Sequence, residues 1–216
     1  MKKTKFIFMM LVACAICLVS CDGKKKAQPA EEPAAEEVQA EEGTLNLERT
    51  INLDKQYMFT KYGEGFRWFE SCITLKYFMD GDTASNEIET IRNVFQVVEQ
   101  CSPTTADVHV VFCTHNGADT EYEVVEGFWI EDYVLNDEQI AVTFDEAIEN
   151  IFETNYPKPH SRQCVLRKEI GTKDANAQYI FGNSDAQLYV DVVDGTVTDT
   201  NPAFGAFVGK PLGEWP

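Results

Sequence analysis

The stretch TFDEAIENIF, residues 143–152, decides the fold more clearly than any other part of the chain. Thr143 and Glu146 have the spacing of a capping box, in which each side chain satisfies an exposed backbone N–H group at a helix start. Apolar residues recur at helical spacing and predict one buried face: Phe144, Ala147, Ile148, Ile151 and Phe152. The sequence Asn155-Tyr156-Pro157 ends the helix, because proline disfavours a helical conformation at the residue before it.

Strand-like runs follow this helix at residues 162–170, 177–182 and 187–193, and the turn Asp194-Gly195 leads into a last run at 196–198. Two earlier runs, 107–114 and 121–130, are joined through Asn116-Gly117. Asn-Gly is typical of the tight turn of a β-hairpin.

Another helix is expected at residues 85–101, because Ile88, Ile91, Phe95 and Val98 recur at i, i+3, i+7 and i+10. The order helix, strand, strand then occurs twice, with helix starts 58 residues apart. We therefore expect an α+β fold, an antiparallel sheet with helices packed on one face. The repeated order predicts two helix-plus-sheet halves, residues 44–137 and 138–216.

Residues 142–198 resemble a PepSY-type domain. The resemblance rests on TFDEAI at the helix start (143–148) and on LYVDVVDGTV (188–197), which is similar to the closing hairpin of that family. It does not cover residues 171–176 or 201–216. The tandem helix-plus-sheet order is also similar in outline to β-lactamase inhibitor proteins. These resemblances imply a non-enzymatic exported module that binds or inhibits a protein, often a peptidase.

The first 21 residues, MKKTKFIFMMLVACAICLVSC, have the pattern of a bacterial export signal. Lys2, Lys3 and Lys5 precede an apolar run of 14 residues, which is too short to span a bilayer comfortably. Leu18-Val19-Ser20-Cys21 resembles a lipobox. That resemblance implies removal of residues 1–20 and acylation of Cys21, with diacylglycerol on the thiol and a chain such as palmitate on the amine. The alternative is an ordinary secretory signal with a coincidental cysteine.

Residues 21–43 are expected to be the lipidated cysteine and a disordered acidic tether. The segment 22–43 has no aromatic residue and is dominated by Ala, Glu and Pro, so it cannot bury enough apolar surface to offset its ordering entropy. We expect anchoring in the cell envelope, at the outer membrane or cell surface rather than the inner membrane.

The chain is strongly acidic, with a formal net charge of −18. Loss of residues 1–20 removes three lysines and no acid, which leaves 15 basic against 36 acidic residues, a charge of −21. This charge repels nucleic acids and anionic membrane surfaces, so neither is expected as a direct partner. The membrane is reached through the lipid alone.

Four cysteines remain after the signal, Cys72, Cys101, Cys113 and Cys164, in an expected oxidising compartment. They allow three disulfide pairings, among which the sequence does not choose, and unpaired small hydrophobic side chains are the alternative. Strand alternation predicts that Cys72 and Cys113 both face away from the apolar side of their strands.

His109, Cys113 and His115 share one strand face and are the residue types that bind zinc or copper. Neighbours on that face lie about 7 Å apart along the strand, so one strand rarely supplies three ligands. Surface polar residues are the interpretation we favour. The sequence has three histidines and contains no Gly-x-Ser-x-Gly elbow, cysteine-protease signature, phosphate loop or calcium loop. We expect no enzymatic activity, no cofactor and no metal.

Phe128-Trp129-Ile130 contains the candidate binding residue. If Phe128 and Ile130 face inward on a strand, Trp129 faces outward. The sequence thus predicts a tethered, non-catalytic module that binds or inhibits an envelope protein or peptidase. The alternative is a glycan- or surface-polymer-binding accessory lipoprotein. Grouped exposed aromatics in a shallow groove would favour the glycan hypothesis, whereas a convex sheet face or an open sheet edge would favour the protein hypothesis.

Overall fold

The computed structural model describes residues 44–102, 105–129, 133–168 and 175–201. The chain divides into two units, residues 1–40 and 41–216, and all described elements belong to the second. The expected signal peptide, the lipidation site Cys21, the tether to residue 43 and the tail 202–216 lie outside the described residues. Within the described ranges, no helix has both the length and the apolar character needed to cross a bilayer.

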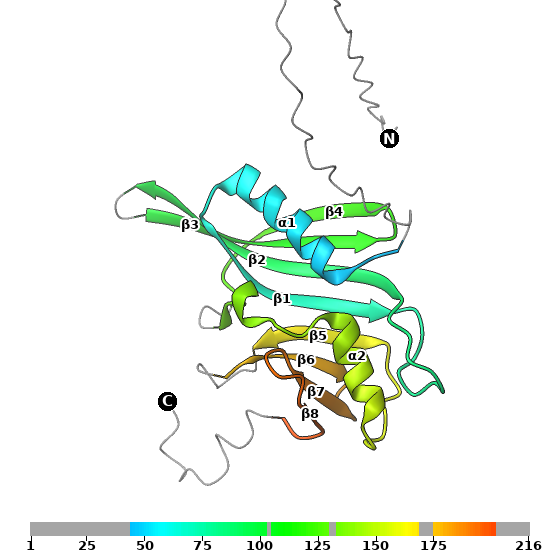
Figure 1. Cartoon of the computed structure of the whole chain (residues 1–216). Coiled ribbons are helices and arrows are strands. Elements are labelled where there is room, and N and C mark those ends of the chain that lie inside the picture. Colours follow the sequence, from blue (N-terminus) through cyan, green and yellow to red (C-terminus); the bar gives the residue numbers. More distant parts are fainter. Residues whose placement is uncertain (1–43, 103–104, 130–132, 169–174, 202–216) are drawn as a thin grey trace, which may run out of the picture. The chain divides into compact units, whose positions relative to one another are not determined.

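The second unit is an α+β structure with an antiparallel sheet, as predicted (Figure 1). In chain order its elements are α1 (Leu47–Tyr62), β1 (Phe66–Leu75), β2 (Ile88–Ser102), β3 (Thr105–Asn116), β4 (Asp119–Glu126), the 3₁₀ helix η2 (Asp137–Gln139), α2 (Phe144–Glu153), β5 (Gln163–Lys168), β6 (Ala177–Gly182), β7 (Gln187–Asp191) and β8 (Val197–Thr198). The eight strands form one sheet in the order β4-β3-β2-β1-β5-β6-β7-β8.

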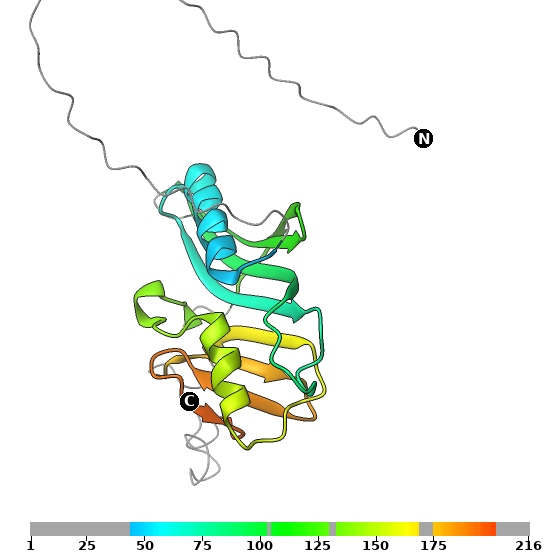
Figure 2. The same cartoon turned by 45° about the vertical axis from the view of Figure 1, so that its right-hand side comes forward.

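Both long helices lie over the same face of this sheet (Figure 2). Buried side chains from both helices and from the strands form one apolar cluster, including Ile51 and Met58 of α1 and Phe144 and Ile151 of α2. The backbone N–H of Phe144 also donates to Glu48 Oε1 of α1 at 2.8 Å. The helices therefore share one core on this side of the sheet. We call the opposite side of the sheet the far face.

The predicted helix at residues 143–152 is confirmed as α2. Thr143 is its N-cap, and the capping box is complete: the backbone N–H of Thr143 donates to Glu146 Oε2 at 2.8 Å, and Glu146 N–H donates to Thr143 Oγ1 at 3.3 Å. Its buried residues are Phe144, Ala147, Ile148 and Ile151. The helix ends at Glu153, before the proline predicted to stop it.

The predicted helix at residues 85–101 is wrong, because this segment is the long strand β2. It pairs with β1 on one side and β3 on the other. Phe95 and Val97 face the helices, and Val94, which precedes Phe95, is buried on the far face. Apolar residues on both faces happened to match a helical spacing, whereas the β-branched residues of the segment fit a strand better.

Helix α1 was not predicted. Asn46 caps it by accepting a hydrogen bond from Arg49 N–H at 2.9 Å, and Gly63, with a φ of 63°, ends it. Its start at Leu47 means that the expected spacing of 58 residues between helix starts is also wrong.

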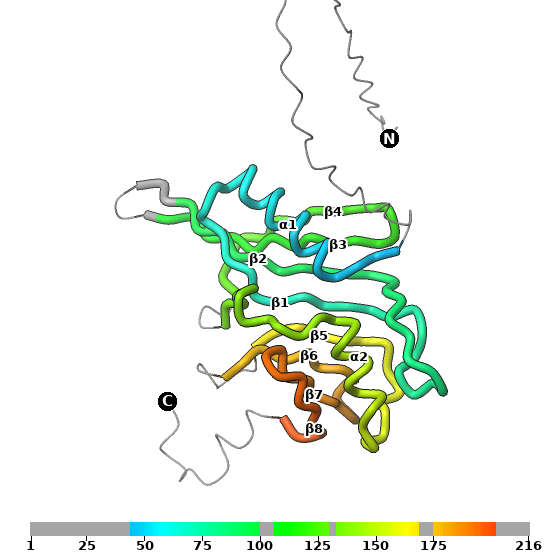
Figure 3. The backbone as a smooth tube through the Cα atoms, in the orientation of Figure 1, coloured from blue at the N-terminus to red at the C-terminus, as the bar shows by residue number. Residues whose placement is uncertain are grey.

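The predicted hairpin is confirmed as β3–β4, with Asn116 opposite Asp119. The two central turn residues are Gly117 and Ala118, and Gly117 has the positive φ, 58°, that a type II′ turn requires at its first central position. The hairpin places β4 at one end of the sheet and leaves β8 at the other (Figure 3).

Candidate functional site

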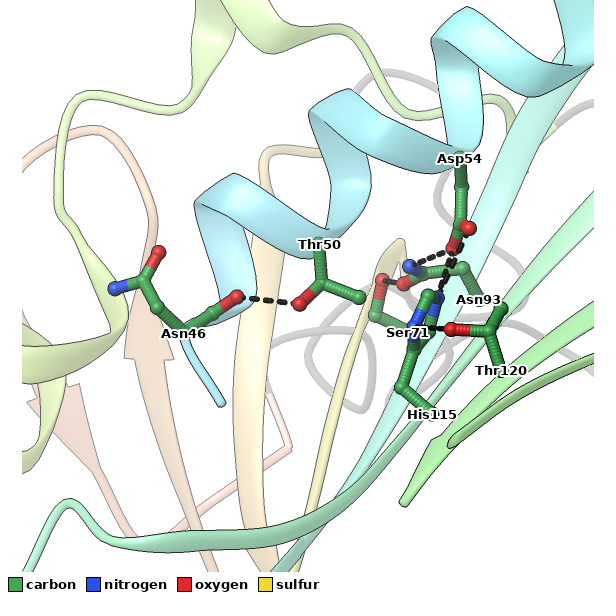
Figure 4. A network of polar contacts seen from close by, with 7 residues as sticks. All are labelled: Asn46, Thr50, Asp54, Ser71, Asn93, His115 and Thr120. Atoms are coloured by element: carbon green, nitrogen blue, oxygen red, sulfur yellow. Dashed lines mark hydrogen bonds and ion pairs between the residues drawn. The ribbon is translucent and has the colours of Figure 1, made fainter. Parts of the chain in front are cut away.

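Asp54 of α1 is fully buried at the centre of a polar network beneath the helix (Figure 4). Its carboxylate accepts hydrogen bonds from Asn93 Nδ2 at 2.7 Å and from His115 Nε2 at 2.9 Å. Ser71 Oγ donates to Asn93 Oδ1 and accepts from Trp68 Nε1 at 3.2 Å. The network thus ties α1 to β1, β2 and β3 through side chains that are otherwise enclosed by the apolar core.

Thr120 of β4 extends this network toward the edge of the sheet. Its Oγ1 lies 3.0 Å from Nδ1 of His115. In the neutral tautomer that donates from Nε2 to Asp54, Nδ1 accepts a hydrogen bond from the Thr120 hydroxyl. A hydroxyl, an imidazole and a carboxylate in this order resemble a nucleophilic relay. Thr120 lines none of the three hollows described below, and the contacts of the network join α1 to the strands of the sheet.

The three candidate metal ligands share the helix-facing side of β3, but they do not converge. His115 contacts Asp54, and His109 Nε2 lies 3.1 Å from Glu99 Oε2. Cys72 pairs in register with Arg92, on the far face. Across the described ranges, no group of three or more His, Cys, Asp or Glu side chains is arranged to hold a metal ion.

Cys72, Cys113 and Cys164 are free thiols, and the side chain of Cys101 lies outside the described residues. Cys72 faces away from the helices, as predicted. The prediction for Cys113 is wrong: it is fully buried on the helix-facing side, because the odd-numbered residues of β3 point toward α1.

Burial suppresses the reactivity of these thiols. It raises the pKa of Cys72 to about 12, with a further increase from the neighbouring Glu70 carboxylate. Burial also raises the pKa of Cys113 and of Cys164. The thiolate is the nucleophilic form, so all three are weak nucleophiles at neutral pH.

The expected orientation at residues 128–130 is reversed. The side chain of Phe128 is 72% exposed, whereas Trp129 is half-buried and packs edge-to-face on Phe112, with ring centroids 6.1 Å apart. The backbone N–H of Trp129 donates to Gln96 Oε1. The strand alternation fails because β4 ends at Glu126, before this segment. Ligand contact by Trp129 stays a prediction, and Ile130 lies outside the described residues.

Strand β4 is exposed along its whole length. All eight of its residues are exposed, and within the described ranges it pairs only with β3. The strand at the opposite end of the sheet, β8, has only two residues. An edge strand presents unpaired backbone N–H and C=O groups to which another extended chain can pair.

The register identifies which backbone groups of β4 point outward. The N–H of Gly127 donates to the carbonyl of Val108 at 3.1 Å, so this pair is a hydrogen-bonded one. Hydrogen-bonded and non-hydrogen-bonded pairs alternate along an antiparallel ladder. The register runs without a shift from His109–Glu126 to Asn116–Asp119. The residues with outward backbone groups are therefore Thr120, Tyr122, Val124 and Glu126.

The two faces of β4 differ in chemistry. Tyr122 and Val124 pair with Cys113 and Val111, which places them on the helix-facing side. Tyr122 stacks on Tyr57 of α1 with ring centroids 3.8 Å apart, and burial raises the pKa of Tyr122 to about 12.

The far face of β4 carries Asp119, Glu121, Glu123 and Val125, and the strand contains no Lys or Arg. Glu123 Oε2 lies 3.7 Å from Arg92 Nη2. Asp119 and Glu121 form no ion pair with any described residue. Carboxylates therefore line this side of the open edge at every second residue from Asp119 to Glu123.

Three hollows are lined by described residues, and one of them reaches Glu126 at the end of β4. One of about 330 Å³ is lined by Arg67, Phe69 and Gln96, and another of about 360 Å³ by Val108, His109 and Phe128 among others. A third, of about 190 Å³, lies beside α1 and η2. None of the three is lined by a serine, threonine or cysteine, so none presents a side-chain nucleophile of these kinds.

Sequence reasoning missed both the buried network and the open edge. Asp54 and His115 are 61 positions apart, and the one local signal is an aspartate that interrupts an apolar stripe of α1. In the pattern DTEYEVVE acidic residues alternate with Thr, Tyr and Val from Asp119 to Val124, and such alternation predicts a half-buried strand. Comparisons with protein families, with curated proteins and with solved structures found no match to this chain.

Proposed function

We propose that the protein is a non-catalytic binding module, tethered to the cell envelope through a lipid on Cys21, that binds or inhibits another envelope protein. The observation that carries this proposal is the open edge of β4, whose eight residues are all exposed and four of which have outward backbone groups. Pairing with such an edge gives affinity through main-chain hydrogen bonds and selectivity through alternate side chains. The lipid anchor would hold this edge at the outer membrane or the cell surface.

The proposal includes two helix-plus-sheet halves, residues 44–137 and 138–216, similar to PepSY-type domains and to the tandem arrangement of β-lactamase inhibitor proteins. The element order supports it, because α1 precedes β1 to β4 and α2 precedes β5 to β8. The first strands of the two halves, β1 and β5, pair at the middle of the sheet. A binding role for the chain is consistent with what these resemblances imply.

The glycan hypothesis has less support, because the largest exposed aromatic side chains among the described residues lie on separate elements. Phe59 lies on α1, Phe128 follows β4, and Tyr77 and Phe78 follow β1. One ring face of Phe78 is already covered by His160, whose ring stacks on it at 4.3 Å. A sugar needs a free ring face on which to stack.

Site-specific photocrosslinking in the native membrane tests the proposal. A benzophenone side chain at Val124 on β4 should give an adduct with one specific envelope protein. The matched control places it at Glu149, an exposed position on α2. Adducts of equal yield and identity at both positions, or no protein adduct at Val124, would contradict the proposal, as would substrate turnover by the purified chain.

A further inference from the structure

We propose that the occupant of the β4 edge is an extended segment of another protein that carries lysine or arginine at every second position and apolar residues between them. This inference rests on the proposed binding function and adds the chemistry of the partner. It follows from three properties of the edge: its outward backbone groups, its carboxylates and its apolar side.

The backbone fixes the mode of pairing. Thr120, Tyr122, Val124 and Glu126 direct their N–H and C=O groups away from β3. A segment of about seven extended residues spans this edge at roughly 3.4 Å per residue. Each outward group needs one partner from the added strand, because the ladder to β3 uses only the other residues of β4.

The carboxylates fix the charge of one face. Asp119, Glu121 and Glu123 lie on the far face at every second position. Side chains of an added strand directly opposite them would have Cβ atoms about 4.5–5.5 Å away, within reach of an ion pair. Lysine or arginine at these positions is favoured, and acidic residues are repelled.

Apolar side chains fix the other face. Val124 is 47% exposed and Tyr122 is 37% exposed on the helix-facing side. Leu53 of α1, 49% exposed, lies one helical turn before Tyr57, whose ring stacks on Tyr122. Together Leu53, Tyr57, Tyr122 and Val124 form an apolar shelf beside the edge, where the alternate side chains of an added strand would be buried.

The same charges argue against a second copy of this chain. Two β4 edges in antiparallel contact would bring their carboxylates close together, and each chain carries a formal charge of −18. Like charges directly opposite each other destabilise strand pairing.

Fluorescence anisotropy with synthetic peptides and the detergent-solubilised full chain tests the inference. The probe is a labelled seven-residue peptide of alternating lysine and valine. A glutamate–valine peptide is the charge control, and a lysine–valine peptide N-methylated on the residues that face β4 is the backbone control. We expect the lysine peptide to bind at least about tenfold more tightly than either control, since several ion pairs or hydrogen bonds are lost in each.

Protein variants separate the backbone from the side chain. Val124→Pro removes one outward N–H and should weaken binding of the lysine peptide about three- to tenfold, whereas Val124→Thr keeps the N–H and should bind within about twofold of wild type. Glu121→Gln should weaken binding about two- to fivefold and reduce its dependence on salt. Thermal melts check that each variant is folded, and the N-methylated peptide needs no change in the protein.

Equal binding of the lysine, glutamate and N-methylated peptides would overturn the inference. If photocrosslinking at Val124 still captured an envelope protein, the binding function would stand without this partner chemistry. A dimer of the full chain that Val124→Pro dissociates would assign the edge to a second copy and would also overturn the inference.

Discussion

Asp54→Ala should lower the free energy of unfolding by about 3–5 kcal/mol, because removal of one partner from a buried, charge-assisted network costs about that much. The structure supplies the reason. Asp54 is fully buried and accepts hydrogen bonds from Asn93 Nδ2 at 2.7 Å and His115 Nε2 at 2.9 Å. Alanine leaves both donors buried without an acceptor, and each unsatisfied group costs about 1–3 kcal/mol.

Urea denaturation followed by circular dichroism measures this change. Gln56→Ala on the same helix is the matched control, because Gln56 is exposed and an exposed substitution should change stability by less than about 0.5 kcal/mol. Asp54→Asn keeps the volume and one oxygen acceptor, so its cost should fall between those of the other two variants. The double variant Asp54→Ala/His115→Ala should lose less than the sum of the single variants, because the two side chains share one interaction.

Asp54→Ala with the same stability as Gln56→Ala would refute the assignment of this network as the link between α1 and the sheet. Additive losses in the double variant would refute the direct coupling of Asp54 to His115. Hydrolytic activity that disappears in Asp54→Ala while the protein stays folded would instead identify Thr120, His115 and Asp54 as a catalytic relay.

Three further predictions concern the anchor, the second helix and the half-buried thiol of Cys72. Cys21→Ser should move the protein from the membrane fraction to the soluble fraction or leave it uncleaved; identical partitioning of wild type and variant would contradict lipidation. Thr143→Ala should cost about 1 kcal/mol through loss of the α2 cap, and Ile148→Ala about 2–5 kcal/mol through a core cavity, in urea melts; negligible losses from both would show that α2 is not packed on the sheet. The pKa of Cys72 is raised from 9.0 to about 12 in the folded protein, so its contribution to stability is present below pH 9.0 and is lost as the pH rises toward 12. Cys72→Ala should therefore reduce the loss of stability above pH 9.0 relative to wild type, and an unchanged pH profile would contradict the raised pKa.

Elements with complete local signals were predicted from the sequence. The capping box of Thr143 and Glu146 lies entirely within the first turn of α2, and the residues that satisfy it are three positions apart. The turn at Gly117 likewise needs only its own residues to reverse the chain. Such signals hold because the groups that interact are neighbours in sequence.

Segments whose structure depends on distant partners were missed or mistaken. β2 has buried residues on both faces, Phe95 and Val97 toward the helices and Val94 on the far face, so its apolar pattern has no single period. The buried stripe of α1 includes Thr50 and Asp54, and polar residues of these types in a sequence predict a solvent-facing position. The Thr50 hydroxyl donates a hydrogen bond to the carbonyl of Asn46 in the preceding turn. The Asp54 carboxylate instead accepts hydrogen bonds from Asn93 and His115, which lie far along the chain. A polar residue can be assigned to the interior only when its partner is known.

The position of β4 at the edge of the sheet also depends on distant partners, so the sequence does not predict it. The residues of this strand contribute little to the stability of the fold and can therefore serve binding. No residue of β4 is buried, so the core above β1, β2 and β3 is enclosed by other elements, and β4 adds chiefly the contacts of Tyr122 with Tyr57 and of Thr120 with His115. A strand that contributes so little apolar burial is free to keep three successive carboxylates, Asp119, Glu121 and Glu123, on one side and Tyr122 and Val124 on the other. The carboxylates discourage pairing with identical chains, as charged residues do on edge strands generally, and they leave the backbone groups available to a basic segment. Substitutions at Glu121 and Val124 should therefore change what binds the edge while they leave the stability of the sheet almost unchanged.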